Sequence, residues 1–232
     1  VSINKLTKDY IMNNSTLFLT HVTCIDFAYL NEYGRAIGKS VDPIIHVSGN
    51  VTEDEQVVVD FSKGKKAIKE LIDAKVGGID HKLVSPVDMA LDVSVENGVA
   101  TVRTSELKAV VPEDAIYLCD VMTTDDIAEK SFEQAFSEEL AHFLDKRIPA
   151  MKHSISIVPG HNQRYDVLKA LSEKDYGLMV DKSFSYTHGL AKSSSWGCQN
   201  IIHGHSSFLC LYSDNSSALS DIRDLADMMA AS

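Results

Sequence analysis

The stretch that decides the fold is SFSYTHGLAKSSSWGCQNIIHGHSSFLCLY, residues 183–212. Polar and apolar residues alternate toward both of its ends, which is typical of strands with two different faces. A serine-rich loop, at residues 193–195, separates these ends. The stretch therefore predicts two antiparallel strands joined by a loop.

The three histidines of this stretch are expected to lie together. His203 and His205 are two residues apart and share one face of their strand, and the alternation before it puts His188 on a single face of the preceding strand. An H-x-H pair alone also occurs on exposed strands without a metal, and the third histidine strengthens the case. Three imidazoles leave the fourth tetrahedral position open, as in a catalytic zinc site, and favour zinc over magnesium or calcium. We therefore predict that His188, His203 and His205 bind zinc.

Cys198 is the candidate catalytic thiol. It lies in the loop SSSWGCQN, five residues before His203. A thiol close to a metal or a base has a lowered pKa and can act as a base or nucleophile. The alternative interpretation is a small buried hydrophobic residue. We expect the other three cysteines to be structural, namely Cys24, Cys119 and Cys210.

Composition and charge exclude several classes of protein. The 232 residues are 44% hydrophobic and 24% charged, which is typical of a globular protein, and the formal net charge is −11. This charge argues against a nucleic-acid backbone or an anionic membrane as the main partner. The longest apolar runs fall far short of the roughly 20 residues of a membrane span, and the N-terminus shows no apolar leader. Without a C-x-x-C pair the thiols are expected to be reduced, so we predict a cytoplasmic protein.

The remaining pattern predicts an α+β protein. The dipeptide Asn97–Gly98 lies between alternating residues and favours a two-residue hairpin turn, while residues 123–146 carry the clearest apolar stripe of a helix. Strands are expected at 16–30, 43–51, 57–61, 153–158, 177–192 and 200–212, a hairpin at 91–104, and helices at 62–75, 123–146, 167–172 and 219–229.

The order of two strands followed by a helix occurs twice along the chain. The second occurrence starts about 160 residues after the first, which favours a tandem duplication. We expect a first copy at 1–165 and the start of a second copy at 176–232, with the polar loop PGHNQRYD between them.

Asp80 and His81 form a second candidate site. They follow Gly77–Gly78 on a connection after a predicted helix. An aspartate beside a histidine can form a proton relay in which the carboxylate orients the imidazole, although the dipeptide also occurs by chance. The five other histidines have no metal-binding spacing and are assigned no role, namely His21, His46, His142, His153 and His161.

These motifs together resemble the 6-pyruvoyltetrahydropterin synthase and 6-carboxytetrahydropterin synthase family. FSYTHGL, a cysteine in a loop, and HGHSSFLCLY resemble the metal-binding opening of that family. In the first copy, VVVDFSKGKKAIKELI is similar to its strand-to-helix segment, IDHKLV to its L-D-H-x-x-L motif, and TTDDIAEKSF to its P-T-S-E-x-L-A helix start. The resemblance covers most of the chain, with its specific residues divided between the two copies.

The resemblance implies a role for each candidate residue. It makes His188, His203 and His205 the zinc ligands and Cys198 the catalytic base, assisted by Asp80 and His81. It also implies the tunnelling fold, an antiparallel four-stranded sheet with two helices on one face, with one complete copy and the start of a second. Family members assemble as homo-oligomers with active sites shared between subunits, so the resemblance implies a trimer of two-copy chains or a hexamer. Zinc and Cys198 of a second copy would then meet Asp80 and His81 of a first copy.

The first copy departs from the family's metal-binding motif. It has Ala28 in FAYL, where a zinc ligand is expected, and no H-G-H near Ile37–Lys39. Near the end of its last strand, where the family has a glutamate that anchors the pterin ring, SISIVPG has Pro159. Only the second copy can therefore hold the metal in the family's way.

The function implied by the resemblance is that of a zinc-dependent lyase. Its substrate would be a small molecule resembling dihydroneopterin triphosphate, in a pterin or 7-deazaguanine (queuosine) pathway. A catalytically inactive member that serves as a binding or assembly module is an alternative. A different zinc-dependent hydrolase on the same fold is a third, because a fold does not fix a reaction.

Overall fold

The computed structural model describes residues 14–50, 60–149, 151–159, 178–188, 202–213 and 219–230. It is an α+β structure, as predicted. The expected strand residues 57–59 and the helix at 167–172 lie outside the described residues. The strands are β1 (Asn14–Leu19), β2 (Ile25–Leu30), β3 (Ala36–Asn50), β4 (Leu83–Ser85), β5 (Val93–Glu96), β6 (Val99–Arg103), β7 (Lys108–Pro112), β8 (Ile116–Leu118), β9 (Lys152–Pro159), β10 (Leu178–His188) and β11 (His203–Ser213). The helices are α2 (Phe61–Ile72), α3 (Thr124–Lys130), α4 (Phe132–Arg147) and α6 (Leu219–Ala230), with short 3-10 turns η1 (Val87–Asp92) and η2 (Glu113–Ala115).

The main sheet has six strands, in the order β1-β3-β2-β4-β8, with β9 also paired to β3. The prediction of a four-stranded antiparallel sheet is therefore wrong for this sheet. The pairs β2–β4 and β4–β8 are parallel, and β4 and β8 have three residues each. Such short strands leave no detectable periodicity in a sequence.

The long strand β3 organises this sheet. It begins at Ala36, earlier than the expected 43–51, and pairs with β2 from Ala36 to Val41 and with β1 from Ile45 to Asn50. The expected single strand at 16–30 is therefore two strands, interrupted at residues 20–24, that pair with successive parts of β3. On β9, residues Lys152 to Pro159 pair with β3 as well.

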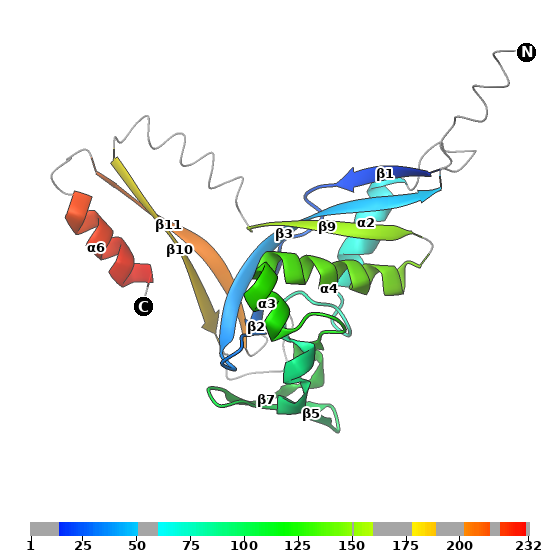
Figure 1. The fold of residues 1–232 in the computed structure, drawn as a ribbon, viewed down its shortest axis with the longest axis horizontal. Helices are drawn as coiled ribbons and strands as arrows, with labels where there is room; N and C mark the ends of the chain where they lie inside the picture. Colours follow the sequence, from blue (N-terminus) through cyan, green and yellow to red (C-terminus); the bar gives the residue numbers. More distant parts are fainter. Residues whose placement is uncertain are drawn as a thin grey trace, which may run out of the picture.

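The core lies between the main sheet and the helices α2 and α4. Figure 1 shows α4 running alongside β9, against which it packs. Rings from the sheet and the helix are in contact: Phe27 stacks on Phe136 with centroids 4.7 Å apart, and Tyr29 lies tilted against Phe132 with centroids 4.4 Å apart. The buried aliphatic residues of β1, β2, β3 and α2 join this cluster: Leu19, Ile25, Val41, Ile45, Val47, Ile68 and Ile72.

The helix expected at 123–146 is broken in two. Ser131 has φ 114°, a backbone angle that a helix cannot contain. The hydroxyl of Ser131 accepts a hydrogen bond from the N–H of Gln134 at 3.3 Å and caps α4, while Thr123 caps α3 in a capping box. The predicted stripe is real, but it spans two capped helices.

A separate three-stranded sheet, β5-β6-β7, contains the predicted hairpin turn. Asn97 and Gly98 have φ 52° and 78°, as a two-residue turn of this kind requires. A hollow of about 660 Å³ lies between this sheet and the loop after α2, lined by Val76, Val95 and Pro112 among others. Among the described residues, no histidine lines it.

Strands β10 and β11 form their own two-stranded antiparallel sheet, as predicted. Helix α6 packs on both strands, and β11 packs against β2 and β3 (Figure 1). Strand β11, which carries the H-x-H motif, therefore lies against the interior strands of the main sheet.

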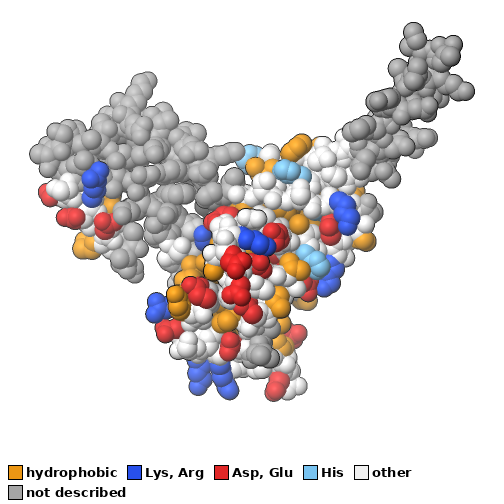
Figure 2. Space-filling model, in the orientation of Figure 1, with side chains coloured by type: hydrophobic (Ala, Val, Ile, Leu, Met, Phe, Trp, Pro, Cys, Tyr) orange, Lys and Arg blue, Asp and Glu red, His pale blue; other side chains and the backbone are white. Residues whose placement is uncertain are grey.

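Helix lengths and surface charge complete the description. Within the described ranges, no helix has both the length and the apolar character needed to cross a membrane. Figure 2 shows acidic side chains gathered near the centre of one face of the molecule, in the region of α3. That face is poorly suited to a polyanionic partner.

Candidate active site between two strand pairs

Strand β11 brings two predicted zinc ligands to the surface of the main sheet. His188 lies directly opposite His203 in the register of β10 and β11, and His205 is two residues further along β11. Paired positions, and positions two apart, occupy the same face of a sheet. His203 is fully buried, including its Nε2 atom. The side chain of His188 and the whole of Cys198 lie outside the described residues.

The turn after α2 positions Asp80 and His81. The backbone N–H groups of Ile79 and Asp80 both donate to the carbonyl of Ile72, at 2.9 and 3.1 Å. His81 has φ 56°, in the left-handed region that costs a non-glycine residue about 1–2 kcal/mol. Its N–H donates to the carbonyl of Asp26 at 2.6 Å, and its Nδ1 lies 2.5 Å from Oδ2 of Asp80. The turn therefore holds the His81 ring against the carboxylate of its neighbour.

Three imidazoles meet where β11 crosses the main sheet. The ring centroids of His81 and His203 are 5.2 Å apart, those of His203 and His205 5.1 Å, and those of His81 and His205 6.3 Å. More than 100 residues of chain separate His81 from the H-x-H motif. The predicted relay and two predicted zinc ligands are thus neighbours within one chain.

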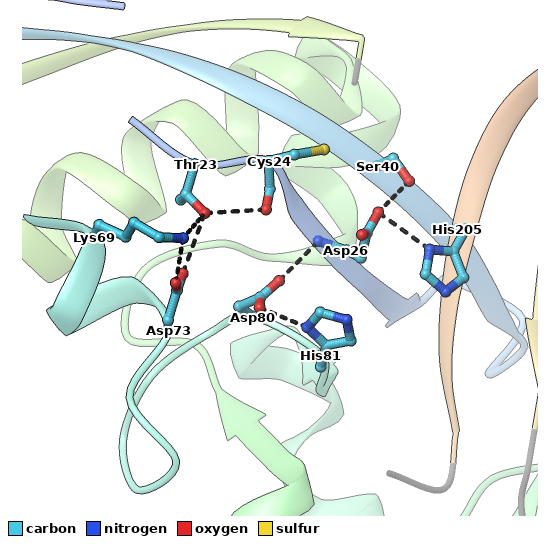
Figure 3. A network of polar contacts seen from close by, with 9 residues as sticks. All are labelled: Thr23, Cys24, Asp26, Ser40, Lys69, Asp73, Asp80, His81 and His205. Carbon is cyan, nitrogen blue, oxygen red and sulfur yellow. Dashed lines mark hydrogen bonds and ion pairs between the residues drawn. The ribbon is translucent and has the colours of Figure 1, made fainter. Parts of the chain in front are cut away.

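Asp26 of β2 is a site residue that the sequence analysis did not identify. Its Oδ1 lies 3.2 Å from Nδ1 of His205 and accepts a hydrogen bond from the hydroxyl of Ser40 (Figure 3). Its backbone N–H donates to Oδ1 of Asp80 at 3.0 Å. A lone aspartate between Ile25 and Phe27, in a strand whose other residues are mostly apolar, was the available signal.

Ser40 and Ser206 join the two strand pairs directly. The N–H of Ser40 donates to the hydroxyl of Ser206 at 2.9 Å, and the N–H of Ser206 donates to the hydroxyl of Ser40 at 3.2 Å. β9 pairs with β3 only from Val41 onward, so Ser40 lies just beyond that ladder. The reciprocal contact fixes β11 at the position where His205 reaches Asp26.

Electrostatics at the site favour the charged forms of Asp26 and His81. Burial alone would raise the pKa of Asp26, but hydrogen bonds with His205 and Ser40 outweigh it and lower the pKa. Burial alone would lower the pKa of His81, but the hydrogen bond and the charge of Asp80 outweigh it and raise the pKa. His81 therefore holds a proton more firmly than an exposed histidine does.

Cys24 and Cys119, by contrast, favour the neutral thiol. Burial, followed by the charges of Asp26 and Asp42, raises the pKa of Cys24 well above its usual range. Burial likewise raises the pKa of Cys119. A thiol that does not ionise is a poor nucleophile, which agrees with the structural role expected for both residues.

The donor set of β11 fits zinc. Two imidazole nitrogens at about 2.0–2.1 Å from one tetrahedral zinc put their ring centres about 5 Å apart, close to the separation of His203 and His205. No group of three or more histidine, cysteine, aspartate or glutamate residues in the described part of the chain has the arrangement of a metal site. The roles of His188, His203, His205, Cys198, Asp80 and His81 stay predictions.

Comparisons with known proteins leave the family open. No family model and no curated protein matches the sequence. The structure is similar to Plasmodium vivax 6-pyruvoyltetrahydropterin synthase (11% identity, 63% of this chain and 98% of that chain, TM-score 0.42) and to a catalytic-residue mutant of it (12%, 63%, 92%, 0.42). It is also similar to the Plasmodium falciparum enzyme (16%, 63%, 99%, 0.37). TM-scores below 0.5 do not establish a shared fold, so the tunnelling fold and its division into copies at 1–165 and 176–232 stay predictions.

Proposed function

We propose that this chain is a zinc-dependent lyase that acts on a small pterin-like molecule resembling dihydroneopterin triphosphate. Its active site would combine residues of β10 and β11 with the turn after α2. The single observation that carries the proposal is the position of His203 and His205 beside His81, whose Nδ1 lies on the carboxylate of Asp80.

Each residue would have one task. His188, His203 and His205 would hold zinc, which when bound polarises oxygen atoms of a substrate. Cys198 would remove a proton from the substrate carbon. His81 would exchange that proton with the thiol, and Asp80 would keep the His81 ring oriented and stabilise its charged form, consistent with the raised pKa of His81.

The position of His81 beside His203 and His205 within one chain supports a composite site that needs no second subunit. The site draws its imidazoles from two segments that are more than 100 residues apart in the sequence, and Ser40 and Ser206 hold these segments together. We propose that any homo-oligomer, a trimer or a hexamer, assembles around complete sites of this kind. The alternative of residues shared between subunits predicts activity only in the oligomer.

The test combines zinc content with turnover. Plasma mass spectrometry on the purified protein should find near one zinc per chain, and little in His203→Ala. Dihydroneopterin triphosphate should be consumed by the wild type and not by Cys198→Ala or Asp80→Asn, both of which should retain zinc. His142→Ala, a half-exposed histidine of α4 outside the site, is the matched control and should retain both properties.

The outcomes separate two candidate functions. Turnover lost in the Cys198 variant with zinc retained supports the lyase. Zinc without turnover of any pterin-like substrate favours a binding or assembly module, which Pro159 at the end of β9 also favours because the family's anchoring glutamate is missing there. A wild type without zinc contradicts the lyase and the zinc site on which it depends.

A further inference from the structure

Two of the imidazoles at this site are each paired with a carboxylate. Nδ1 of His81 lies 2.5 Å from Asp80, and Nδ1 of His205 lies 3.2 Å from Asp26. A carboxylate on Nδ1 stabilises the tautomer that carries its proton there, so that Nε2 is the nitrogen with the lone pair. Only the Asp80–His81 pair is contained in a recognisable sequence motif.

Asp26 is itself held in place from several directions. It pairs with Ser40 across β2 and β3, and the hydroxyl of Ser40 donates to its carboxylate. Its backbone bonds to both members of the turn, through N–H to Asp80 and through C=O to His81. Only 17% of its side chain is exposed. A carboxylate so restrained can orient a partner ring with little freedom of its own.

The contact between Asp26 and His205 joins the two halves of the site. Asp26 belongs to the pair β2–β3, whereas His205 belongs to the pair β10–β11, which carries the proposed zinc ligands. The reciprocal bonds of Ser40 and Ser206 lie beside this contact. A carboxylate at this position supplies what an imidazole ligand usually needs on its second nitrogen.

We propose that Asp26 is a positioning residue that holds His205 in the Nδ1-protonated tautomer, so that Nε2 of His205 binds zinc. The first strand pair thus contributes to the metal site through a carboxylate instead of through ligands of its own. The inference rests on the proposed zinc site, but the tautomer of His205 can be measured without any metal.

The first experiment measures zinc affinity by competition with a chelating dye. Asp26→Asn and Asp26→Ala should each weaken zinc binding about 10–100-fold, the usual effect of removing such a partner. Asp120→Asn removes a carboxylate that lies 3.6 Å from His142 on the surface, and this matched control should bind zinc as the wild type does. Asp26→Glu should recover part of the affinity.

The second experiment reads the tautomer from ¹⁵N shifts of His205 in metal-free protein at pH 8. The wild type should carry the proton on Nδ1, and Asp26→Asn should shift the population toward Nε2. A merely structural role would leave that equilibrium unchanged in a folded variant. Equal zinc affinity and an equal tautomer population in the wild type and Asp26→Asn would overturn the inference, even if the wild type binds zinc.

The two proposals fail in different ways. A wild type that binds no zinc contradicts the proposed function, and the ¹⁵N measurement then decides on Asp26 alone. An Nε2-protonated His205 in the wild type overturns the inference, whatever the metal content.

Discussion

Strands β2–β3 and strands β10–β11 each form an antiparallel pair followed by a helix, but their surroundings differ. Five of the six β2 residues are buried, and helix α2 buries Ile68 and Ile72 against the same core. In α6, by contrast, Ala226 is the one fully buried side chain among those described, while Leu225, Met228 and Met229 are exposed. The first pair is held by apolar packing, and the described contacts of the second pair with the main sheet include polar bonds to Asp26 and Ser40.

This difference separates the residues that stabilise the fold from the residues of the proposed metal site. The main sheet with helices α2 and α4, called here the first part, supplies the stable surface, the carboxylates and His81. The second part, formed by β10, β11 and α6, supplies the H-x-H imidazoles. Substitutions in the apolar core should therefore lower the stability of the whole protein and disturb the site as well. Substitutions at the polar contact should disturb the site with little loss of overall stability.

The largest effect is expected from Phe136→Ala. Phe136 is fully buried and stacks on Phe27, so its truncation should destabilise the protein by about 3–5 kcal/mol. Denaturant unfolding followed by circular dichroism measures this. Zinc binding should weaken as well, because β11 packs against the destabilised sheet. A loss below about 1 kcal/mol would contradict the stabilising role assigned to this core.

The burial of Lys82 in the first part can be tested through the pH dependence of stability. It is fully buried, its Nζ donates to the carbonyl of Lys75 at 2.7 Å, and burial lowers its pKa from 10.5 to about 8, although Asp114 and Asp80 oppose this. Between pH 8 and 10.5 the unfolded chain therefore holds more protons, so the wild type gains stability as pH rises. Lys82→Met lacks this gain, and the stability of the variant relative to the wild type should fall by roughly 3 kcal/mol over that range. A pH-independent difference between the two unfolding curves would refute the buried ammonium.

Ser206→Ala tests the contact between the two parts. It removes the hydroxyl that accepts from the N–H of Ser40 at 2.9 Å, at a cost of about 1 kcal/mol. Hydrogen exchange should become faster in β11 but not in β9. Ser185→Ala, at the paired position on β10 and exposed, is the control and should exchange as the wild type does. Equal protection in both variants would mean that the hydroxyl of Ser206 does not help to hold β11.

The smallest effect is expected from Met228→Ala on α6. Met228 is 65% exposed, so its truncation should change stability by no more than about 0.5 kcal/mol. Met122→Ala, at a position 1% exposed in the main core, should cost about 2–5 kcal/mol. Similar losses in the two thermal unfolding curves would show that the second part is packed as tightly as the first.

Strong local patterns predicted their elements correctly. The alternation at 183–212 gave β10 and β11, and Asn97–Gly98 gave the turn between β5 and β6. The break at Ser131 was missed because an apolar stripe continues across it, and only the cap geometry shows two helices. The short parallel strands β4 and β8 depend on pairing with distant segments, which no local pattern records.

The sequence predicts candidate residues for the site but not how they come together. The dipeptide predicts that the side chains of Asp80 and His81 form a pair, and in the structure they are in contact. Their place beside His203 and His205 depends on how β11 crosses β2 and β3, which spacing along the chain cannot give. Asp26 was missed because one charged residue in an apolar strand has meaning only when its partner, His205, is in view.

The most direct test of the account is the position of zinc in a crystal of the zinc-loaded protein, located by anomalous scattering at the zinc edge. The account predicts one strong peak at about 2.0–2.1 Å from nitrogen atoms of His203 and His205, with the ring of His81 beside it and Asp26 on Nδ1 of His205. A peak elsewhere, or no peak in protein that contains stoichiometric zinc, would contradict the composite site.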